Sequence, residues 1–273
     1  MHTSLDDLSL ILGEISLFRA LPGEEISEIA HAAEVISLGK GCAIYAAGDR
    51  PRALYHVMSG HLKVSVSSRD GGEKVIEILS PRQLFGVSEL FGDAPCVSSV
   101  ETVTPVVLLA VGRDAILRAI ERDQALARRM LGAMAQRQSS IERDIAADCF
   151  QSGTDKVVDY LRRLADSAAK SGRAQGRVVE IELEIPKYVL AARMGFTPET
   201  LSRIFRELSD AGMIHVHGKL VTLLEAFAHA PGARPLPVTG RALTPSCAGR
   251  AVGSGWFSSH GAGRTAGLAA QPA

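Results

Sequence analysis

Glycine recurs at short intervals between residues 39 and 92 and divides this part of the chain into short runs of β-type composition. The clearest such runs in the first half of the chain are residues 54–58, 62–66, 75–79 and 106–111. Asp70-Gly71-Gly72 lies between two of them and is typical of a hairpin turn. Short strands with regular turn signals predict a small β-sandwich or jelly roll.

The chain as a whole is long enough for two domains, with 273 residues and an apolar fraction of 46%. Lysine plus arginine equals aspartate plus glutamate at 30 each, so the net charge is zero. A neutral chain neither indicates nor excludes nucleic-acid binding, because a local basic face is sufficient.

The cysteines and the N-terminus indicate a reducing, cytoplasmic setting. Cys42, Cys96, Cys149 and Cys247 are far apart and form no CxxC pair or metal-binding spacing, so the metal content is left open. Residues 1–15 are acidic early and lack the basic region of a signal peptide. No apolar run approaches the roughly 18 residues of a membrane span, so we expect no membrane association.

Residues 114–148 contain no proline and a single glycine, which predicts a long helix. Its apolar residues recur at alternating steps of three and four, as in the seam of two paired helices. The predicted seam is Leu131, Met134, Gln138, Ile141 and Ile145, with Gln138 as a polar layer. The pattern favours a homodimer, and a buried helix within one protomer is the alternative.

The segment after residue 150 reads as helix, strand, two short helices and a hairpin. Thr154 is the expected cap of the first helix, and residues 179–185 alternate in the manner of a half-buried strand. Residues 186–194 form the next expected helix, followed by Gly195, and residues 212–223 form the hairpin. Two helices joined by a tight turn containing glycine, followed by a hairpin, indicate a winged helix-turn-helix.

The second of these two helices has the composition of a helix that reads DNA. Thr197 is a good N-cap and Pro198 suits the first helical position. One face is apolar, and the other carries Glu199, Ser202, Arg203 and Arg206. Arginine can bind guanine O6 and N7 together, and glutamate can accept from cytosine N4. An ordinary amphipathic surface helix is the alternative.

These motifs resemble one family. Gly39-Lys40-Gly41, Gly48-Asp49 and the run from Leu54 to Gly60 look like the opening of a cyclic-nucleotide-binding-type β-roll, the sensor domain of CRP/FNR transcription regulators. The likeness of the roll covers roughly residues 17–112. Residues 154–224 resemble the winged helix of the same family, and Thr197-Pro198-Glu199-Thr200-Leu201-Ser202-Arg203 is the most specific motif.

The resemblance implies an α+β fold with a sensor β-roll of jelly-roll type (1–112), a dimerisation helix (113–149) and a winged helix-turn-helix (150–228). Residues 229–273 lie outside the resemblance, and their Pro/Gly/Ala/Ser/Arg-rich composition predicts a disordered tail. In FNR-like members the positions of Glu199, Ser202 and Arg203 read a TTGAT half-site, and Pro198 favours this site over a TGTGA site. The family acts on promoter DNA and recruits RNA polymerase. Expected further contacts to DNA are Thr197, Arg206 and Lys219.

The family's phosphate cassette is altered in this chain. Members that bind cyclic AMP place a glutamate on the ribose and an arginine on the phosphate, and those positions are Val87 and Val97 here. An unpaired phosphate buried in the roll would be costly. Cyclic AMP is therefore not expected, and the effector pocket is expected to be apolar. Its predicted residues are Val87, Ser88, Val97 and Ser98.

This departure resembles the FNR, Dnr and FixK branch of the family. No cysteine precedes Cys42, so an iron–sulfur cluster is not expected. The pattern is most similar to Dnr-type regulators, which implies a response to nitric oxide or oxygen limitation through haem. His31, His56 and His61 lie in the sensor region, but no motif fixes a haem ligand, and a surface or hydrogen-bonded histidine is the alternative for each.

Other functions remain open at this point. The chain could be a FixK-like regulator without a cofactor, controlled by abundance or by oxidation of a thiol such as Cys96, or a cyclic-nucleotide-responsive regulator. An enzyme or channel controlled by the roll would need a catalytic or membrane segment. We find no nucleophile–base pair, metal cluster or phosphate loop in the sequence, so no catalysis is expected.

Overall fold

The computed structural model describes residues 4–68, 70–92, 94–170, 179–224 and 226–227. The predicted tail, residues 229–273, lies outside these residues. The described residues belong to one compact unit. Its helices and strands follow one another along the chain as α1 (Leu5–Glu14), α2 (Gly23–Ala30), β1 (Ala33–Leu38), β2 (Ala43–Tyr45), β3 (Ala53–Ser59), β4 (Leu62–Ser67), β5 (Glu73–Leu79), β6 (Leu84–Phe85), α3 (Val87–Phe91), β7 (Ser99–Thr102), β8 (Val106–Gly112), α4 (Arg113–Arg122), α5 (Gln124–Phe150), α6 (Gly153–Lys170), β9 (Val179–Glu182), α7 (Lys187–Met194), α8 (Pro198–Asp210), β10 (Ile214–His217) and β11 (Leu220–Leu223).

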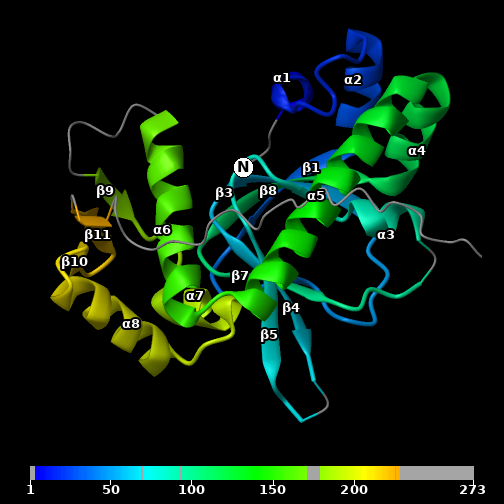
Figure 1. The fold of residues 1–273 in the computed structure, drawn as a ribbon. Helices are drawn as coiled ribbons and strands as arrows, with labels where there is room; N and C mark the ends of the chain where they lie inside the picture. Colours follow the sequence, from blue (N-terminus) through cyan, green and yellow to red (C-terminus); the bar gives the residue numbers. More distant parts are fainter. Residues whose placement is uncertain (1–3, 69, 93, 171–178, 225, 228–273) are drawn as a thin grey trace, which may run out of the picture. The chain divides into compact units, whose positions relative to one another are not determined.

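Two four-stranded antiparallel sheets form the first half, as Figure 1 shows for the blue to green strands. One sheet has the order β1-β8-β3-β6 and the other has the order β2-β7-β4-β5. This confirms the predicted jelly roll. The sequence predicts strands β3, β4, β5 and β8, whereas the shorter or more polar strands β1, β2, β6 and β7 are not predicted.

Strand β8 is buried on both faces, which explains its nearly continuous apolar sequence. Val106 and Leu108 point into the interior of the roll, and Leu109 and Val111 pack on the other side with the N-terminal helices and α5. The sheet that contains β8 therefore lies between the second sheet and a layer of helices.

Gly60 makes the tight turn between β3 and β4 possible. Its φ is +81°, and a Cβ atom added there would lie 2.2 Å from the carbonyl oxygen of Pro105. A residue with a side chain cannot take this position without a shift of the backbone.

The predicted single helix over 114–148 is wrong at Asp123. This residue has φ −123° and ψ 96°, and its side chain accepts a hydrogen bond from the backbone N–H of Ala125. Asp123 therefore ends α4 and caps α5. An aspartate in the middle of a helical pattern can form such a cap, and only the neighbouring contacts decide that it does.

The predicted cap of the next helix is also wrong. Helix α6 begins at Gly153, and the hydroxyl of Ser152, not that of Thr154, accepts the N–H of Asp155 at 3.2 Å. The Asp155 carboxylate in turn accepts the hydroxyl proton of Ser152 at 2.7 Å. Ser152 and Thr154 lie two residues apart and have similar capping propensity. The direction of the chain as it leaves α5 places the hydroxyl of Ser152 in the capping position.

Helices α6, α7 and α8 pack with a three-stranded sheet of order β10-β11-β9. Strand β9 alternates exposed glutamates with the partly buried Val179 and the buried Ile181, as predicted, but it ends at Glu182 and not at the predicted residue 185. Strands β10 and β11 form the predicted hairpin, with Ile214 opposite Leu223. The segment is a helix-turn-helix followed by a wing.

Candidate nucleic-acid interface

The turn between α7 and α8 is formed by backbone geometry that its sequence favours. Gly195 ends α7 with a φ of +76°, and its N–H bonds the carbonyls of Ala191 and Ala192. The hydroxyl of Thr197 accepts the N–H of Thr200 at 3.2 Å, and Pro198 begins α8. The predicted cap and first helical position are both confirmed.

The apolar face of α8 fixes which side of the helix is exposed. Leu201, Ile204, Phe205 and Leu208 are all at most 5% exposed and belong to the core shared with α6, α7 and the wing. Because this face is buried, the opposite face must point to solvent. The predicted residues Glu199, Ser202, Arg203 and Arg206 are all exposed on it.

The three side chains expected to contact bases, Glu199, Ser202 and Arg203, differ in whether they donate or accept hydrogen bonds. The side chain of Arg203 is 71% exposed, and its Nε lies 3.8 Å from Oε1 of Glu207. The hydroxyl of Ser202 donates to the carbonyl of Pro198 at 2.8 Å and keeps its lone pairs as acceptors. Glu199 offers a carboxylate, and hydrogen bonds from its own backbone N–H and from the Thr197 hydroxyl lower its pKa. The face thus presents one forked donor and two acceptors.

Two further predicted contacts flank this face. Arg206 lies one turn beyond Ser202 on α8 and is exposed. Lys219 is exposed at the turn of the wing, next to Gly218 with a φ of +62°. Both are exposed cations of the winged helix-turn-helix, which suits contact with phosphate.

The structure places the predicted effector residues in different environments. Val87 is buried in the core with the N-terminal helices, and Ser88 is exposed beside it on α3. Val97 is 82% exposed, and Ser98 is partly buried. Val87 and Val97 therefore do not share one apolar pocket in this structure. Val97 lies in an irregular segment before β7. Such a segment has no helix or strand periodicity, so the sequence does not predict whether the side chain is buried or exposed.

Aromatic side chains fill the interior of the roll instead. The rings of Tyr55 and Phe85 stack with centroids 4.9 Å apart, and Tyr45 lies 6.4 Å from Phe85. Burial raises the pKa of Tyr45, and the nearby carboxylate of Glu89 raises it further. These residues are not among the predicted site residues, because aromatic residues in strands indicate a core as readily as a site.

Helix α5 also reaches the roll through a charged side chain. Nη2 of Arg137 lies 2.9 Å from Oε2 of Glu77 on β5. Both side chains are less than one third exposed, and Arg137 is close enough to Tyr45 to act on its pKa. No sequence signal links residues 60 positions apart on a helix and a strand.

The three sensor histidines do not converge on one site. His31 donates from Nδ1 to the carbonyl of Ser27 at 2.8 Å, and Nε2 of His61 lies 2.9 Å from Oε2 of Glu184. His56 has an unpartnered Nδ1, and burial lowers its pKa.

Haem iron needs an axial side chain that faces a cavity wide enough for a porphyrin. By strand alternation His56 points away from the interior of the roll, to the side of Leu54 and Met58, which pack with the helices. His56 is therefore not placed to bind a group inside the roll. Within the same residues no group of three or more His, Cys, Asp or Glu side chains could hold a metal ion.

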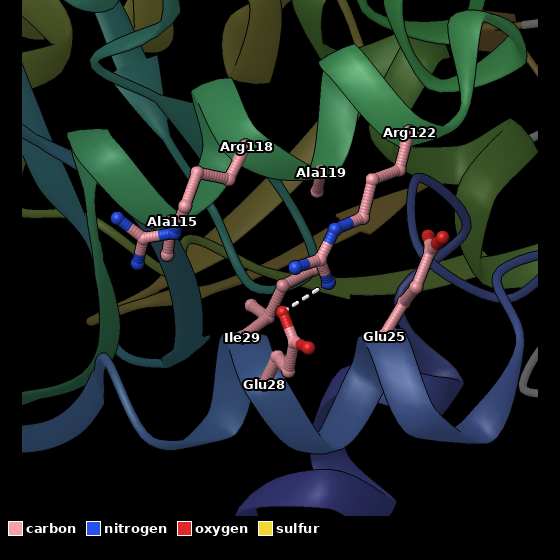
Figure 2. Close-up of a pocket in the computed structure, with 7 residues that line it drawn as sticks. All are labelled: Glu25, Glu28, Ile29, Ala115, Arg118, Ala119 and Arg122. Carbon is pink, nitrogen blue, oxygen red and sulfur yellow. Dashed lines mark hydrogen bonds and ion pairs between the residues drawn. The ribbon is translucent and has the colours of Figure 1, made fainter.

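A small gap between α2 and α4 is also not an effector site. Figure 2 shows it lined by Glu25 and Glu28 on one side and by Arg118 and Arg122 on the other, with Arg122 paired to Glu28. Its volume is about 10 Å³, close to the space of a single water molecule. The gap therefore fits packing between the helices and no larger ligand.

The predicted dimer seam is only partly exposed. Leu131 is 63% exposed, Ile145 is 57% exposed, and Gln138 is exposed midway between them. Met134 packs against the core of its own sensor, and Ile141 lines a cleft beside β5 and α6. Leu131, Gln138 and Ile145 are seven residues apart and share one face of α5. None of the described helices is long and apolar enough to cross a bilayer.

Comparison with known proteins agrees with this architecture. Residues 35–123 match the cyclic nucleotide-binding domain, and residues 155–227 match the Crp-like helix-turn-helix domain. The chain is 24% identical over 224 residues to a CRP-like cAMP-activated global transcriptional regulator of Mycobacterium tuberculosis, covering 82% of this chain and 99% of that protein. It is 26% identical over 210 residues to the cyclic AMP receptor protein of Thermus thermophilus, covering 77% and 93%.

A solved structure shows the same fold. FixK2 from Bradyrhizobium japonicum superimposes with a TM-score of 0.64 at 19% identity, over 74% of this chain and 98% of that one. The matches follow the same order of sensor roll, long helix and winged helix that the geometry shows. The chain belongs to the CRP/FNR family of DNA-binding transcription regulators.

Proposed function

We propose that two copies of this chain bind a TTGAT-like palindrome in promoter DNA and change transcription there in response to a small effector. The observation that carries the proposal is the exposed face of α8, where Glu199, Ser202 and Arg203 stand together on a capped and well-packed helix. Recruitment of RNA polymerase is the output that we infer.

Each reading residue has a role that its chemistry supports. Arg203 would bind guanine O6 and N7, Glu199 would accept from N4 of the opposite cytosine, and Ser202 would lie near thymine. Arg206 and Lys219 would contact phosphate and set the register without reading sequence.

A two-fold site requires a two-fold protein. The support for a dimer is the exposed line of Leu131, Gln138 and Ile145 along α5. Large aliphatic side chains more than half exposed at a heptad spacing are expected to be covered by a second copy of the same helix.

The experiment is fluorescence anisotropy with a TTGAT-N4-ATCAA duplex, a TGTGA-type duplex and a scrambled duplex at one fixed salt concentration. We expect the first duplex to bind most tightly. Equal affinity for all three would contradict the proposed site, because it would indicate phosphate contacts alone.

A cyclic-nucleotide-responsive regulator is the second candidate, favoured by the match of residues 35–123 and by the named activator of the relatives. Valine at both cassette positions opposes it. Addition of cyclic AMP to the same anisotropy assay separates the two, since we expect no change in affinity.

The response to nitric oxide or oxygen limitation through haem stays a prediction from the sequence. An absorption spectrum after addition of haem, with and without nitric oxide, tests it. A regulator of the FixK-like kind without a cofactor would show no specific spectrum in that experiment.

A further inference from the structure

Two aspartates one turn apart on α5 join the sensor to the DNA-binding segment. Asp144 pairs with Arg193 of α7. Asp148 lies 3.1 Å from Nζ of Lys74 on β5 and 2.9 Å from Nζ of Lys156 on α6. Two carboxylates therefore hold β5, α6 and α7 together. We call these five residues the aspartate clamp.

The clamp acts at the end of α7, directly before the turn that leads to α8. Lys74 also donates to the backbone carbonyl of Arg193 at 3.4 Å. A Cβ atom added to Gly195 would lie 3.3 Å from the same Nζ. The ammonium of Lys156 lies 5.6 Å from the ring centroid of Phe196. Arg193, Gly195 and Phe196 thus receive the contacts, and Thr197 begins the cap of α8 two residues after Gly195.

Apolar packing supports the same junction. Val103 and the partly buried Ile78, both from the sensor, join the core that contains α7 and α8. Nε2 of His61, in the turn just before β4, lies 2.9 Å from Oε2 of Glu184, just before α7. The junction therefore combines apolar contacts with a rim of charged pairs, and most residues of that rim line an open cleft.

We propose that Asp144 and Asp148 are positioning residues for DNA recognition, which set the direction in which α8 is presented relative to α5. The inference rests on the proposed function, because it needs α5 to pair two copies and α8 to read DNA. The reading face of α8 stays exposed while the clamp is formed, so the clamp does not cover the DNA site.

The physical reason is preorganisation. A two-fold site demands that two α8 helices enter two half-sites at a fixed separation. If each DNA-binding segment could rotate about the end of α5, that freedom would be lost on binding and would weaken the complex. The clamp removes the freedom beforehand. It should therefore strengthen binding to the correct spacing and have little effect on a single half-site.

The test compares wild type with the Asp144→Asn/Asp148→Asn variant on three duplexes: the palindrome, the palindrome with one base pair added to the spacer, and a single half-site. We expect the variant to bind the palindrome about tenfold more weakly, as for other coupled contacts. We expect unchanged affinity for the half-site and a smaller penalty for the altered spacer. A merely structural role would not change spacer preference.

Further variants keep the test independent of folding. Lys74→Met breaks one contact from the sensor side and should give a weaker form of the same loss. Either Asp144→Arg or Arg193→Asp alone should remove the loss of affinity that an added base pair in the spacer causes. The double swap Asp144→Arg/Arg193→Asp should restore that loss, because it restores the ion pair. Glu121→Gln, an exposed acid on α4 outside both the clamp and the dimer seam, is the control and should leave all three affinities unchanged.

Carbodiimide cross-linking couples amines to carboxylates that are in contact. It therefore tests, in the absence of DNA, whether the Lys74–Asp148 contact of the clamp is formed. Wild type should yield a Lys74–Asp148 cross-linked peptide by mass spectrometry. If wild type selects the palindrome and the double variant keeps the same spacer penalty, or binds more tightly, this inference alone is overturned. If wild type does not select the palindrome, the proposed function fails and this inference fails with it.

Discussion

The hydroxyl oxygen of Thr197 lies 3.2 Å from the backbone nitrogen of Thr200 and accepts its N–H. This single bond caps α8, the helix that carries Glu199, Ser202 and Arg203. Because the cap lies at the exposed end of the helix, it can be changed without opening the core.

Replacing Thr197 with alanine leaves the N–H of Thr200 without its partner. We expect a loss of about 1 kcal/mol in the free energy of unfolding, measured by urea denaturation. Thr197→Ser keeps the hydroxyl and is the matched control. Equal stability of the alanine and serine variants would show that the hydroxyl does not act as a cap in solution.

Arg203→Ala removes the forked donor from the reading face. We expect a loss of about 1–3 kcal/mol in binding to the palindrome, and relaxed base preference at one position of each half-site. Arg206→Ala is the control, since a lost phosphate contact should weaken all sequences alike and reduce the salt slope by about one. A uniform loss for Arg203→Ala would reassign it to phosphate.

Charged residues on the exposed face of α5 should separate the dimer. Leu131→Glu/Ile145→Glu places like charges where two copies would meet, and both side chains are more than half exposed, so each protomer should stay folded. Sedimentation velocity should show monomers, and Gln136→Glu, exposed on another side of the helix, should stay dimeric. A double variant that remains a dimer would place the interface elsewhere.

Two glycine substitutions should have opposite effects. Gly60→Ala would force a Cβ to 2.2 Å from the Pro105 carbonyl oxygen at a φ of +81°, and we expect a cost of about 1–3 kcal/mol or more. Gly132 lies inside α5, with nothing within 4 Å of an added Cβ. Gly132→Ala should therefore stabilise the protein by about 0.5–1 kcal/mol. Thermal unfolding measures both, and a tolerated Gly60→Ala would contradict the turn geometry.

Asp148 should make stability depend on pH. Burial alone would raise the pKa of its carboxyl, but hydrogen bonds from Lys156 and Lys74 outweigh this and lower it below the ordinary value. A lowered folded-state pKa gives stability that is present above the unfolded pKa, near 4, and is lost as the pH falls through the folded value.

Wild type should accordingly be more stable than Asp148→Asn near neutral pH, by less than about 1 kcal/mol because the pair is partly exposed. The difference should vanish in acid. Urea unfolding from pH 3 to pH 7 measures it, and a difference that does not change with pH would show that the carboxylate is not paired in solution.

Local patterns in the sequence were sufficient for the parts of the fold that depend on neighbouring residues. Alternation in β9 and the helical spacing of Leu201, Ile204, Phe205 and Leu208 predicted their buried faces, and Thr197, Pro198 and Gly195 predicted the ends of two helices. Such features are decided within a few residues, because a cap or a buried stripe needs only the spacing of its own element.

Contacts between distant residues decided the rest. Asp123 interrupts the helical pattern because it caps α5, Val97 points to solvent, and Lys74 meets Asp148 from 74 positions away. The chain contains several other aspartates, valines and lysines. The residue type alone therefore does not predict which of them forms a cap, an exposed position or an ion pair. The sequence by itself determined where α8 begins and which of its faces is exposed, whereas only the tertiary structure decided what holds that helix in place, because burial and charge pairing depend on which elements meet.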